Sequence, residues 1–128
     1  MSGNKAKRVL VVEHDDGIAT ALEYLISREG LAQDRVASGT AAMERIRKFR
    51  PDLVLLDATV PGVSGYEICR SVRGDRELSH VKILMMTARG LASERRRGTE
   101  LGADGFVSKP FELKDLREQM RRLLAPGA

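Results

Sequence analysis

The stretch Pro51-Asp52-Leu53-Val54-Leu55-Leu56-Asp57-Ala58-Thr59-Val60-Pro61-Gly62 decides the fold class of this chain. Its apolar run, Leu53 to Leu56, is typical of a parallel strand that is buried on both faces. The Pro61-Gly62 pair beyond it predicts a turn. Asp57 therefore stands where a central strand gives way to a loop. In open α/β sheets, ligands bind at this carboxyl-terminal edge of the strands.

Three other segments with polar residues follow predicted strands and point to the same edge. They are Glu13-His14-Asp15-Asp16, Thr87-Ala88 and Lys109-Pro110. A carboxylate directly after four apolar residues is costly to bury unless it has partners. Carboxylate, hydroxyl and ammonium groups on one edge suit a phosphoryl group carried on an aspartate, because its oxygens need bonding and charge neutralisation.

Strand-like and helix-like segments alternate five times, which predicts an α/β doubly wound parallel sheet with helices on both faces. The predicted strands are 8–12, 33–37, 52–56, 81–86 and 105–107, and the predicted helices are 17–28, 39–48, 66–73, 93–101 and 113–124. Asp15 or Asp16 is expected to cap the first helix, and Gly30 to end it. Helix 93–101 is expected to be the loosest, because it has few apolar residues and Gly98 costs about 1 kcal/mol relative to Ala.

The composition fits a single domain over residues 1–128, with its core at about 7–124. Only 4% of the 128 residues are aromatic, so a stacking platform for single-stranded nucleic acid is not expected. The single cysteine, Cys69, is interpreted as a small buried hydrophobe. No segment has the length of a signal-peptide core or a membrane span, so a soluble, cytoplasmic protein is expected.

The net charge of +4 arises in the second half of the chain, notably at Arg95-Arg96-Arg97 and Arg121-Arg122. One interpretation is a docking face for an acidic partner. A solvated helix surface is the favoured interpretation, because Glu94, Glu100 and other acidic residues interrupt the basic runs. Nucleic-acid binding is the weakest of the three, and no nucleic-acid partner is expected.

Four motifs carry a resemblance to a known family. They are Val9-Leu10-Val11-Val12-Glu13, Pro51-Asp52-Leu53-Val54-Leu55-Leu56-Asp57, Met85-Met86-Thr87-Ala88-Arg89 and Gly102-Ala103-Asp104-Gly105-Phe106-Val107-Ser108-Lys109-Pro110-Phe111. In this order and spacing they resemble the receiver domain of bacterial two-component response regulators. The resemblance implies a flavodoxin-like (βα)5 sheet in the order 2-1-3-4-5. No output domain is visible in the chain, so a stand-alone receiver is expected.

The resemblance implies that Asp57 is the phospho-acceptor. It would take a phosphoryl group from the phosphohistidine of a sensor histidine kinase or a histidine phosphotransferase. Lys109 would neutralise one phosphoryl oxygen and the Thr87 hydroxyl would bond another. The Lys109-Pro110 bond is expected to be cis, as is typical of the family. The domain is not expected to be an enzyme beyond the loss of its own phosphate, at a rate tuned by Thr59 and Arg89.

The first acidic segment departs from the family pattern at one position. The family normally has two adjacent acidic residues where this chain has Glu13-His14. The implied Mg²⁺ ligands are Glu13, Asp57 and the backbone carbonyl of Thr59, with His14 or Asp15 as an open further position. Mg²⁺ prefers oxygen ligands, whereas imidazole suits Zn, Cu, Fe or Ni.

Several outcomes of this departure stay open. Asp15 or Asp16 could replace the missing ligand, or Mg²⁺ could bind weakly without it. The domain could also be a phosphate-independent pseudo-receiver, or His14 could simply face solvent without a role in metal binding. A gain of transition-metal binding is the least favoured outcome, because one histidine among carboxylates is a poor signature for such a site.

The resemblance also implies a switch and a partner surface. Phe106 stands where the family often has an aromatic residue with a hydroxyl group, and it is expected to move together with Thr87 on phosphorylation. The surface around Phe106, which carries Arg95, Arg96 and Arg97, is predicted to bind a downstream protein of unknown identity. A monomer or a weak dimer is expected.

Two enzyme classes fit the motifs less well. A phosphatase of the haloacid dehalogenase type also uses an aspartate at a strand end, but it needs an acid two residues later, where this chain has Thr59. A P-loop nucleotide site is not expected, because the chain has no Gly-x-x-x-x-Gly-Lys motif.

Overall fold

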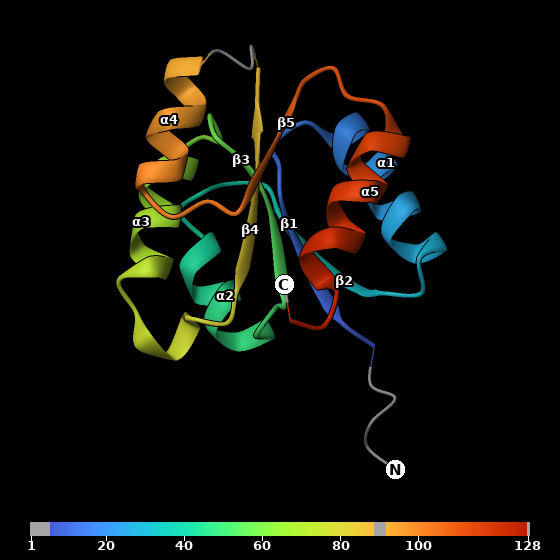
Figure 1. Ribbon diagram of the computed structural model, residues 1–128, viewed down its shortest axis with the longest axis horizontal. Coiled ribbons are helices and arrows are strands. Elements are labelled where there is room, and N and C mark those ends of the chain that lie inside the picture. Colours follow the sequence, from blue (N-terminus) through green and yellow to red (C-terminus); the bar gives the residue numbers. More distant parts are fainter. Residues whose placement is uncertain (1–5, 89–91, 128) are drawn as a thin grey trace.

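Five parallel strands form the centre of the molecule, which Figure 1 shows nearly edge-on. The computed structural model describes residues 6–88 and 92–127. The strands are β1 (Arg8–Val12), β2 (Ala32–Val36), β3 (Leu53–Asp57), β4 (Lys82–Thr87) and β5 (Gly105–Ser108). Their spatial order, β2-β1-β3-β4-β5, confirms the predicted flavodoxin-like topology. Leu56 pairs with Val12 on one side and Met85 on the other, so β3 is the central strand.

The helices cover both faces of this sheet. In Figure 1, α1 (Asp16–Arg28) and α5 (Leu113–Leu124) lie on one side, and α2 (Ala42–Phe49), α3 (Gly65–Arg73) and α4 (Ala92–Glu100) on the other. Successive side chains of a strand point to opposite faces. Leu53 and Leu55 therefore enter the core beneath α1 and α5, whereas Val54 and Leu56 enter the core beneath α2 and α3. Central strands buried on both sides explain the continuous apolar run in the sequence.

The predicted start of the second helix is wrong. The helix begins at Ala42, three residues after Gly39. A Cβ atom on Gly39 would stand 1.7 Å from the carbonyl oxygen of Val63, and the Gly39 N–H donates to the carbonyl of Pro61. These contacts with the loop after β3 hold residues 39–41 in a turn. Sequence periodicity could not reveal them, because they depend on a distant segment.

Other boundaries differ by one residue, and one element was missed. The second strand begins at Ala32, which pairs with Arg8, and ends before Ala37. A short 3₁₀ helix, η2 (Arg76–Leu78), connects α3 to β4 and was not predicted. None of the helices in the part of the chain that the structure describes has the length and apolar character needed to span a membrane.

The ends of α1 follow the predicted capping. Asp15 is the N-cap, and its side chain accepts a hydrogen bond from the Ile18 N–H at 2.9 Å, whereas Asp16 is the first helical residue. Gly30 follows the helix with φ 74°, a conformation that glycine adopts readily.

Candidate functional site

Four side chains meet at the carboxyl-terminal edge of the sheet. Asp57 and Thr87 are the last residues of β3 and β4, Glu13 follows β1, and Lys109 follows β5. Parallel strands all end at one edge, so residues far apart in sequence become neighbours there. Glu13, Asp57 and Thr87 are all buried. The structure therefore brings together the residues that the sequence singled out for phosphoryl chemistry.

Lys109 joins the two buried carboxylates. Its Nζ atom lies 2.6 Å from Glu13 Oε1 and 3.5 Å from Asp57 Oδ2. The other oxygen of Glu13 accepts the backbone N–H of Asp15 at 2.9 Å. Charges are buried stably only when they are paired and hydrogen-bonded. The shorter contact means that Lys109 is held chiefly by Glu13, with Asp57 at the margin of a direct ion pair.

Asp57 is held in one orientation by the loop that follows it. Its Oδ1 atom accepts the backbone N–H of Thr59 at 3.0 Å and the Thr59 hydroxyl at 3.2 Å. Oδ2 is left on the side of the ammonium group. The carboxylate thus has one oxygen anchored and one directed at the only lysine in this cluster.

Thr87 brings a buried hydroxyl to the site. Within the described residues, its Oγ1 atom has no hydrogen-bond partner. Buried hydroxyl groups without partners are rare and call for a physical explanation, such as a ligand that the hydroxyl binds. The backbone after β5 is tied to the end of β4, because the Lys109 N–H donates a hydrogen bond to the Thr87 carbonyl at 2.7 Å. The Lys109-Pro110 peptide bond is cis, which confirms the prediction.

The acidic segment after β1 places the candidates for a further metal ligand. The His14 side chain is exposed, the Asp15 carboxylate caps α1, and Asp16 forms an ion pair with Arg35. Both carboxylates therefore have protein partners here, and a role for either as the further ligand stays a prediction. Across residues 6–88 and 92–127, no three His, Cys, Asp or Glu side chains form a group that could hold a metal ion.

Two carboxylates nevertheless converge on a single positive charge. Glu13 and Asp57 both approach the Lys109 ammonium, which shows that their oxygens can share one cation. Both are hard oxygen donors, and Mg²⁺ is often bound by one or two carboxylates with water completing its octahedron. Glu13 and Asp57 therefore fit Mg²⁺ by donor chemistry, with fewer charged ligands than an acidic residue at position 14 would give. The Thr59 carbonyl stays a predicted ligand.

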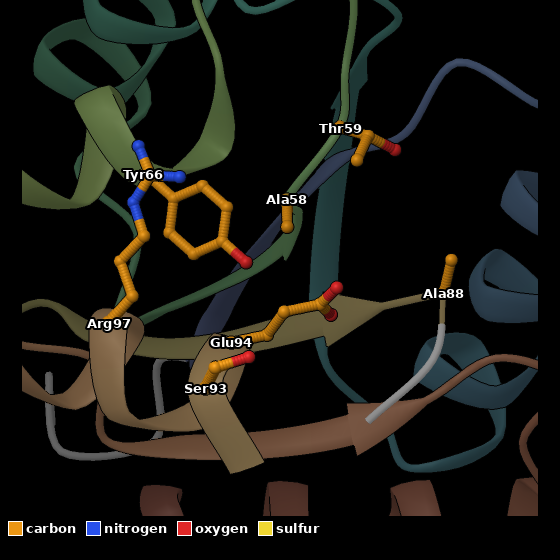
Figure 2. A pocket seen from close by; sticks show the side chains of 7 residues that line it. All are labelled: Ala58, Thr59, Tyr66, Ala88, Ser93, Glu94 and Arg97. Carbon is orange, nitrogen blue, oxygen red and sulfur yellow. The ribbon is translucent and has the colours of Figure 1, made fainter. Parts of the chain in front are cut away.

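A cavity of about 400 Å³ opens beside the end of β3. Figure 2 shows the side chains that line it. Its walls are Ala58, Thr59, Tyr66, Ala88, Ser93, Glu94 and Arg97. The Arg97 guanidinium lies over the Tyr66 ring at 4.2 Å, a cation–π contact that joins α4 to α3. Burial raises the pKa of the Tyr66 hydroxyl, and the neighbouring Glu94 raises it further. Tyr66 and Glu94 carried no recognisable signal in the sequence.

Phe106 packs against α4 at its only buried residue, Gly98. A Cβ atom on Gly98 would stand 2.6 Å from Phe106 Cε1, so the glycine makes room for the ring. The sequence suggested only that Gly98 weakens the helix. The structure gives the reason why it is there.

Arg95 and Arg97 of the Arg95-Arg96-Arg97 run border different cavities. Arg95 borders a cavity of about 370 Å³ together with Phe106, Asp115 and Glu118, whereas Arg97 borders the cavity at Tyr66. All three arginines are exposed. The predicted partner surface around Phe106 therefore contains Arg95, while Arg97 points to the other side of α4.

Arg35 was missed by the sequence analysis. This β2 residue donates to the carbonyl oxygens of Glu13 and His14 and pairs with Asp16. No local signal could have found it, because it lies 22 residues from Glu13 in an edge strand. Arg89 and Leu91 fall outside the described residues, so the expected role of Arg89 in dephosphorylation stays a prediction.

Comparison with known proteins shows which family the sequence belongs to. A profile of the response regulator receiver domain matches residues 9–121. The chain belongs to the response regulator receiver domains. Members of this family act in two-component signalling, where they accept a phosphoryl group from histidine kinases, and they generally bind Mg²⁺ in the active site.

Curated relatives of this receiver domain are longer proteins. The phosphate regulon transcriptional regulatory protein PhoB of Rhizobium meliloti is 39% identical over 117 residues, which are 91% of this chain and 52% of PhoB. The DNA-binding response regulator MtrA of Mycobacterium tuberculosis strain H37Rv is 39% identical over 118 residues, 92% of this chain and 50% of MtrA. The receiver domain thus spans about half the length of the relatives it matches.

Solved structures of similar receiver domains have the same fold. A protein described as a response regulator from Chloroflexus aurantiacus superimposes with a TM-score of 0.88 at 35% identity, covering 93% of this chain and 98% of that one. The receiver domain of sensor histidine kinase PA1611 from Pseudomonas aeruginosa superimposes with a TM-score of 0.83 at 26% identity, covering 92% and 97%. That structure has a magnesium ion coordinated in its active-site cleft.

Proposed function

We propose that this receiver domain accepts a phosphoryl group on Asp57 from the phosphohistidine of a sensor histidine kinase or a histidine phosphotransferase. Asp57 Oδ2 would form the bond to phosphorus as the P–N bond breaks, and the departing imidazole nitrogen would keep that electron pair and take a proton. The observation that carries the proposal is the orientation of Asp57, with Oδ1 anchored by Thr59 and Oδ2 on the side of Lys109.

Lys109 and Thr87 are the proposed partners of the phosphoryl oxygens. Transfer of a phosphoryl group depends mainly on positioning and on neutralising charge. Lys109 would shift from Glu13 toward a phosphoryl oxygen, and it starts with both carboxylates within 3.5 Å. The buried Thr87 hydroxyl would gain the hydrogen-bond partner that the described residues do not give it.

Glu13, Asp57 and the Thr59 carbonyl are the proposed residues for Mg²⁺. The ion, when bound, would neutralise charge on the phosphoryl oxygens. Because His14 supplies neither an oxygen nor a negative charge, we expect weaker binding than two acidic residues would give. Glu13 would keep its second oxygen on the Asp15 N–H, which holds the carboxylate in place.

Output would pass through Phe106. The Phe106 ring packs on Gly98 of α4. Thr87 of β4 pairs with Ser108 of β5, the strand that carries Phe106. A hydroxyl drawn to the phosphoryl group and a ring that changes its packing would shift the population of α4 and β5 arrangements. The proposed output surface for a downstream protein is the Arg95 side of α4. DNA binding is said of MtrA, and no nucleic-acid contact is proposed for this receiver domain.

The test is intact-mass analysis after incubation with acetyl phosphate, with and without Mg²⁺. We expect one added phosphoryl group in the wild-type chain with Mg²⁺, and none in Asp57→Asn. Asp115→Asn removes an exposed carboxylate of α5 and should still be labelled. Labelling that survives in Asp57→Asn would contradict the assignment of the acceptor.

A failure to label at high Mg²⁺ would instead support the phosphate-independent pseudo-receiver. That alternative rests on His14, whose exposed side chain supplies no acidic ligand, and nothing else among the described residues favours it. Slow loss of the phosphoryl group by hydrolysis is also proposed, because Thr59, which bonds Asp57, also lines the cavity at the end of β3.

A further inference from the structure

Arg35 binds two residues of the loop between β1 and α1 and the first residue of α1. The Arg35 Nε and Nη2 atoms donate to the Glu13 carbonyl oxygen at 3.2 and 2.8 Å. Nη2 also donates to the His14 carbonyl at 3.2 Å, and Nη1 lies 2.9 Å from Asp16 Oδ1. Arginine can make such a set of bonds because its guanidinium group is a rigid, planar fork of donors.

These bonds fix the backbone of Glu13 from both ends. The Glu13 N–H donates to the Val36 carbonyl at 3.2 Å, and the Glu13 carbonyl accepts from Arg35. Both partners come from β2. A residue whose N–H and C=O are both held has little freedom to rotate, so its side chain leaves the backbone in one direction. The Glu13 carboxylate accordingly points to Lys109 and Asp57, while the His14 side chain points to solvent.

We propose that Arg35 is a positioning residue for the divalent cation of this receiver domain, acting through the backbone of Glu13 and His14. The inference rests on the proposed function, because it takes Glu13 as a ligand of the ion. A chain with a second acidic residue would anchor the loop partly through the ion itself. Here position 14 is a histidine, so the loop depends on a protein cation to keep Glu13 aimed at the site.

The ion pair with Asp16 is the lesser part of this arrangement. The Asp16 side chain is 91% exposed, and ion pairs of exposed groups contribute little because water and salt screen them. The Arg35 side chain is only 24% exposed, and its bonds to the two carbonyl groups are correspondingly less screened. The positive charge of Arg35 by itself would repel a metal ion. A test substitution therefore has to keep this charge and remove the hydrogen bonds of the guanidinium group.

The substitution Arg35→Lys meets both conditions, because it keeps the charge and removes the fork. Mn²⁺ serves as the probe, since it accepts the same oxygen ligands as Mg²⁺ and its free form is counted by its electron paramagnetic resonance signal. Loss of a group that orients a metal ligand typically weakens metal binding 10- to 100-fold. We expect the Mn²⁺ dissociation constant of the full chain to rise about tenfold in Arg35→Lys.

Two variants serve as controls, and circular dichroism checks that each is folded. Arg45→Lys alters an ion pair with Asp34, the residue next to Arg35, and leaves the loop untouched. Asp16→Asn removes the exposed ion pair and keeps the carbonyl bonds. Both should leave the Mn²⁺ dissociation constant within about twofold, because neither touches the bonds to Glu13 and His14.

The outcomes are distinct. An unchanged dissociation constant in Arg35→Lys overturns the inference, and so does an equal rise in Asp16→Asn, which would assign the effect to the ion pair. If the wild-type chain binds no Mn²⁺, the proposed metal site fails and this inference fails with it. If the wild-type chain binds Mn²⁺ and only the Arg35→Lys result is negative, the proposed metal site stands and the inference alone is lost.

Discussion

His14 is the residue that most distinguishes this receiver domain from the pattern of its family. The Lys109, Glu13 and Asp57 cluster is assembled at the edge of the sheet, and its charges are paired within 3.5 Å. His14 takes no part in this cluster, and its side chain is exposed. The acidic segment therefore departs from the family pattern at His14, while Glu13 stays in the charged cluster with Lys109 and Asp57. The expected consequence is a metal site with one negative charge fewer than an acidic residue at position 14 would give.

Replacing His14 with aspartate should strengthen Mg²⁺ binding. The change adds an oxygen ligand and a negative charge beside Glu13, and ligand charge is a main determinant of affinity for hard cations. We expect the dissociation constant to fall about tenfold, which is about 1.4 kcal/mol, as measured by isothermal titration calorimetry.

The other histidine of the chain provides the matched control. His80 is exposed and precedes β4, at the end of the sheet opposite the site. His80→Asp makes the same change in charge and should leave the affinity unchanged. If both variants tighten binding equally, the gain comes from net charge, and position 14 has no special place in the site.

Helix α4 is the element whose packing the sequence described least well. Its only buried residue is Gly98, which receives the Phe106 ring of β5. Arg97 reaches Tyr66 of α3 on the other side of the helix. Contacts made by a glycine and by an exposed arginine leave α4 with a small apolar interface. The expectation that α4 is the loosest helix stays a prediction, and its packing supplies a physical reason for it.

The effect of Gly98→Ala should depend on Phe106. Alanine favours the helix by about 1 kcal/mol, but its Cβ would meet the ring at 2.6 Å. Overpacking costs about 1–3 kcal/mol, so we expect Gly98→Ala to lower the free energy of unfolding by about 1 kcal/mol. In a Phe106→Ala background the same substitution should raise it by about 1 kcal/mol.

Urea unfolding of the four proteins in this double-mutant cycle measures the coupling. Gly74→Ala is a suitable comparison, because its Cβ would meet only ordinary contacts from 3.4 Å outward. A Gly98→Ala effect of the same sign in both backgrounds would show that the ring and the glycine are not coupled.

The molecule as a whole is held together by two cores on the two faces of one sheet. Side chains alternate between them along each strand, so the central strands stabilise both layers at once. Polar contacts also join elements within a layer. Glu29, directly after α1, pairs with Arg121 of α5 at 2.7 Å, and this hydrogen bond lowers the pKa of the Glu29 carboxyl below its ordinary value of 4.5.

Stability at acidic pH should report on this pair. A carboxyl group whose pKa is lowered in the folded state stabilises the fold above its unfolded pKa and loses this effect as pH falls through its folded pKa. Glu29→Gln should therefore lower the free energy of unfolding by about 0.5–1 kcal/mol near pH 7. The difference from wild type should begin to shrink as the pH falls below 4.5 and should vanish below the lowered pKa of the folded state.

Chemical denaturation as a function of pH measures this difference. Glu44→Gln alters an exposed pair with Lys48 within one helix and should have no measurable effect at any pH. A Glu29→Gln effect that does not shrink at all as the pH falls from 7 into the acidic range would mean that the charge of Glu29 is not its cause.

The order of elements and the residues of the candidate site followed from local sequence patterns. Apolar runs of strand length, separated by segments of helical periodicity, are local signals, and parallel strands must end at a common edge. That rule alone predicted that Glu13, Asp57, Thr87 and Lys109 would meet. Glu13, Asp57 and Thr87 are buried at this edge, and their role in a functional site stays a prediction.

The contacts that these residues make depend on the tertiary structure. Lys109 lies closest to Glu13, 96 residues away in sequence, and Arg35 reaches Glu13 from a neighbouring strand. Gly39 lies against the Val63 carbonyl, and Gly98 lies against the Phe106 ring, so neither position has room for a side chain. No local sequence pattern connects either glycine to its neighbour. Such contacts depend on the distance between side chains after packing. Periodicity assigns a residue to a face or an edge, whereas only the packed structure brings a particular pair of atoms within bonding reach.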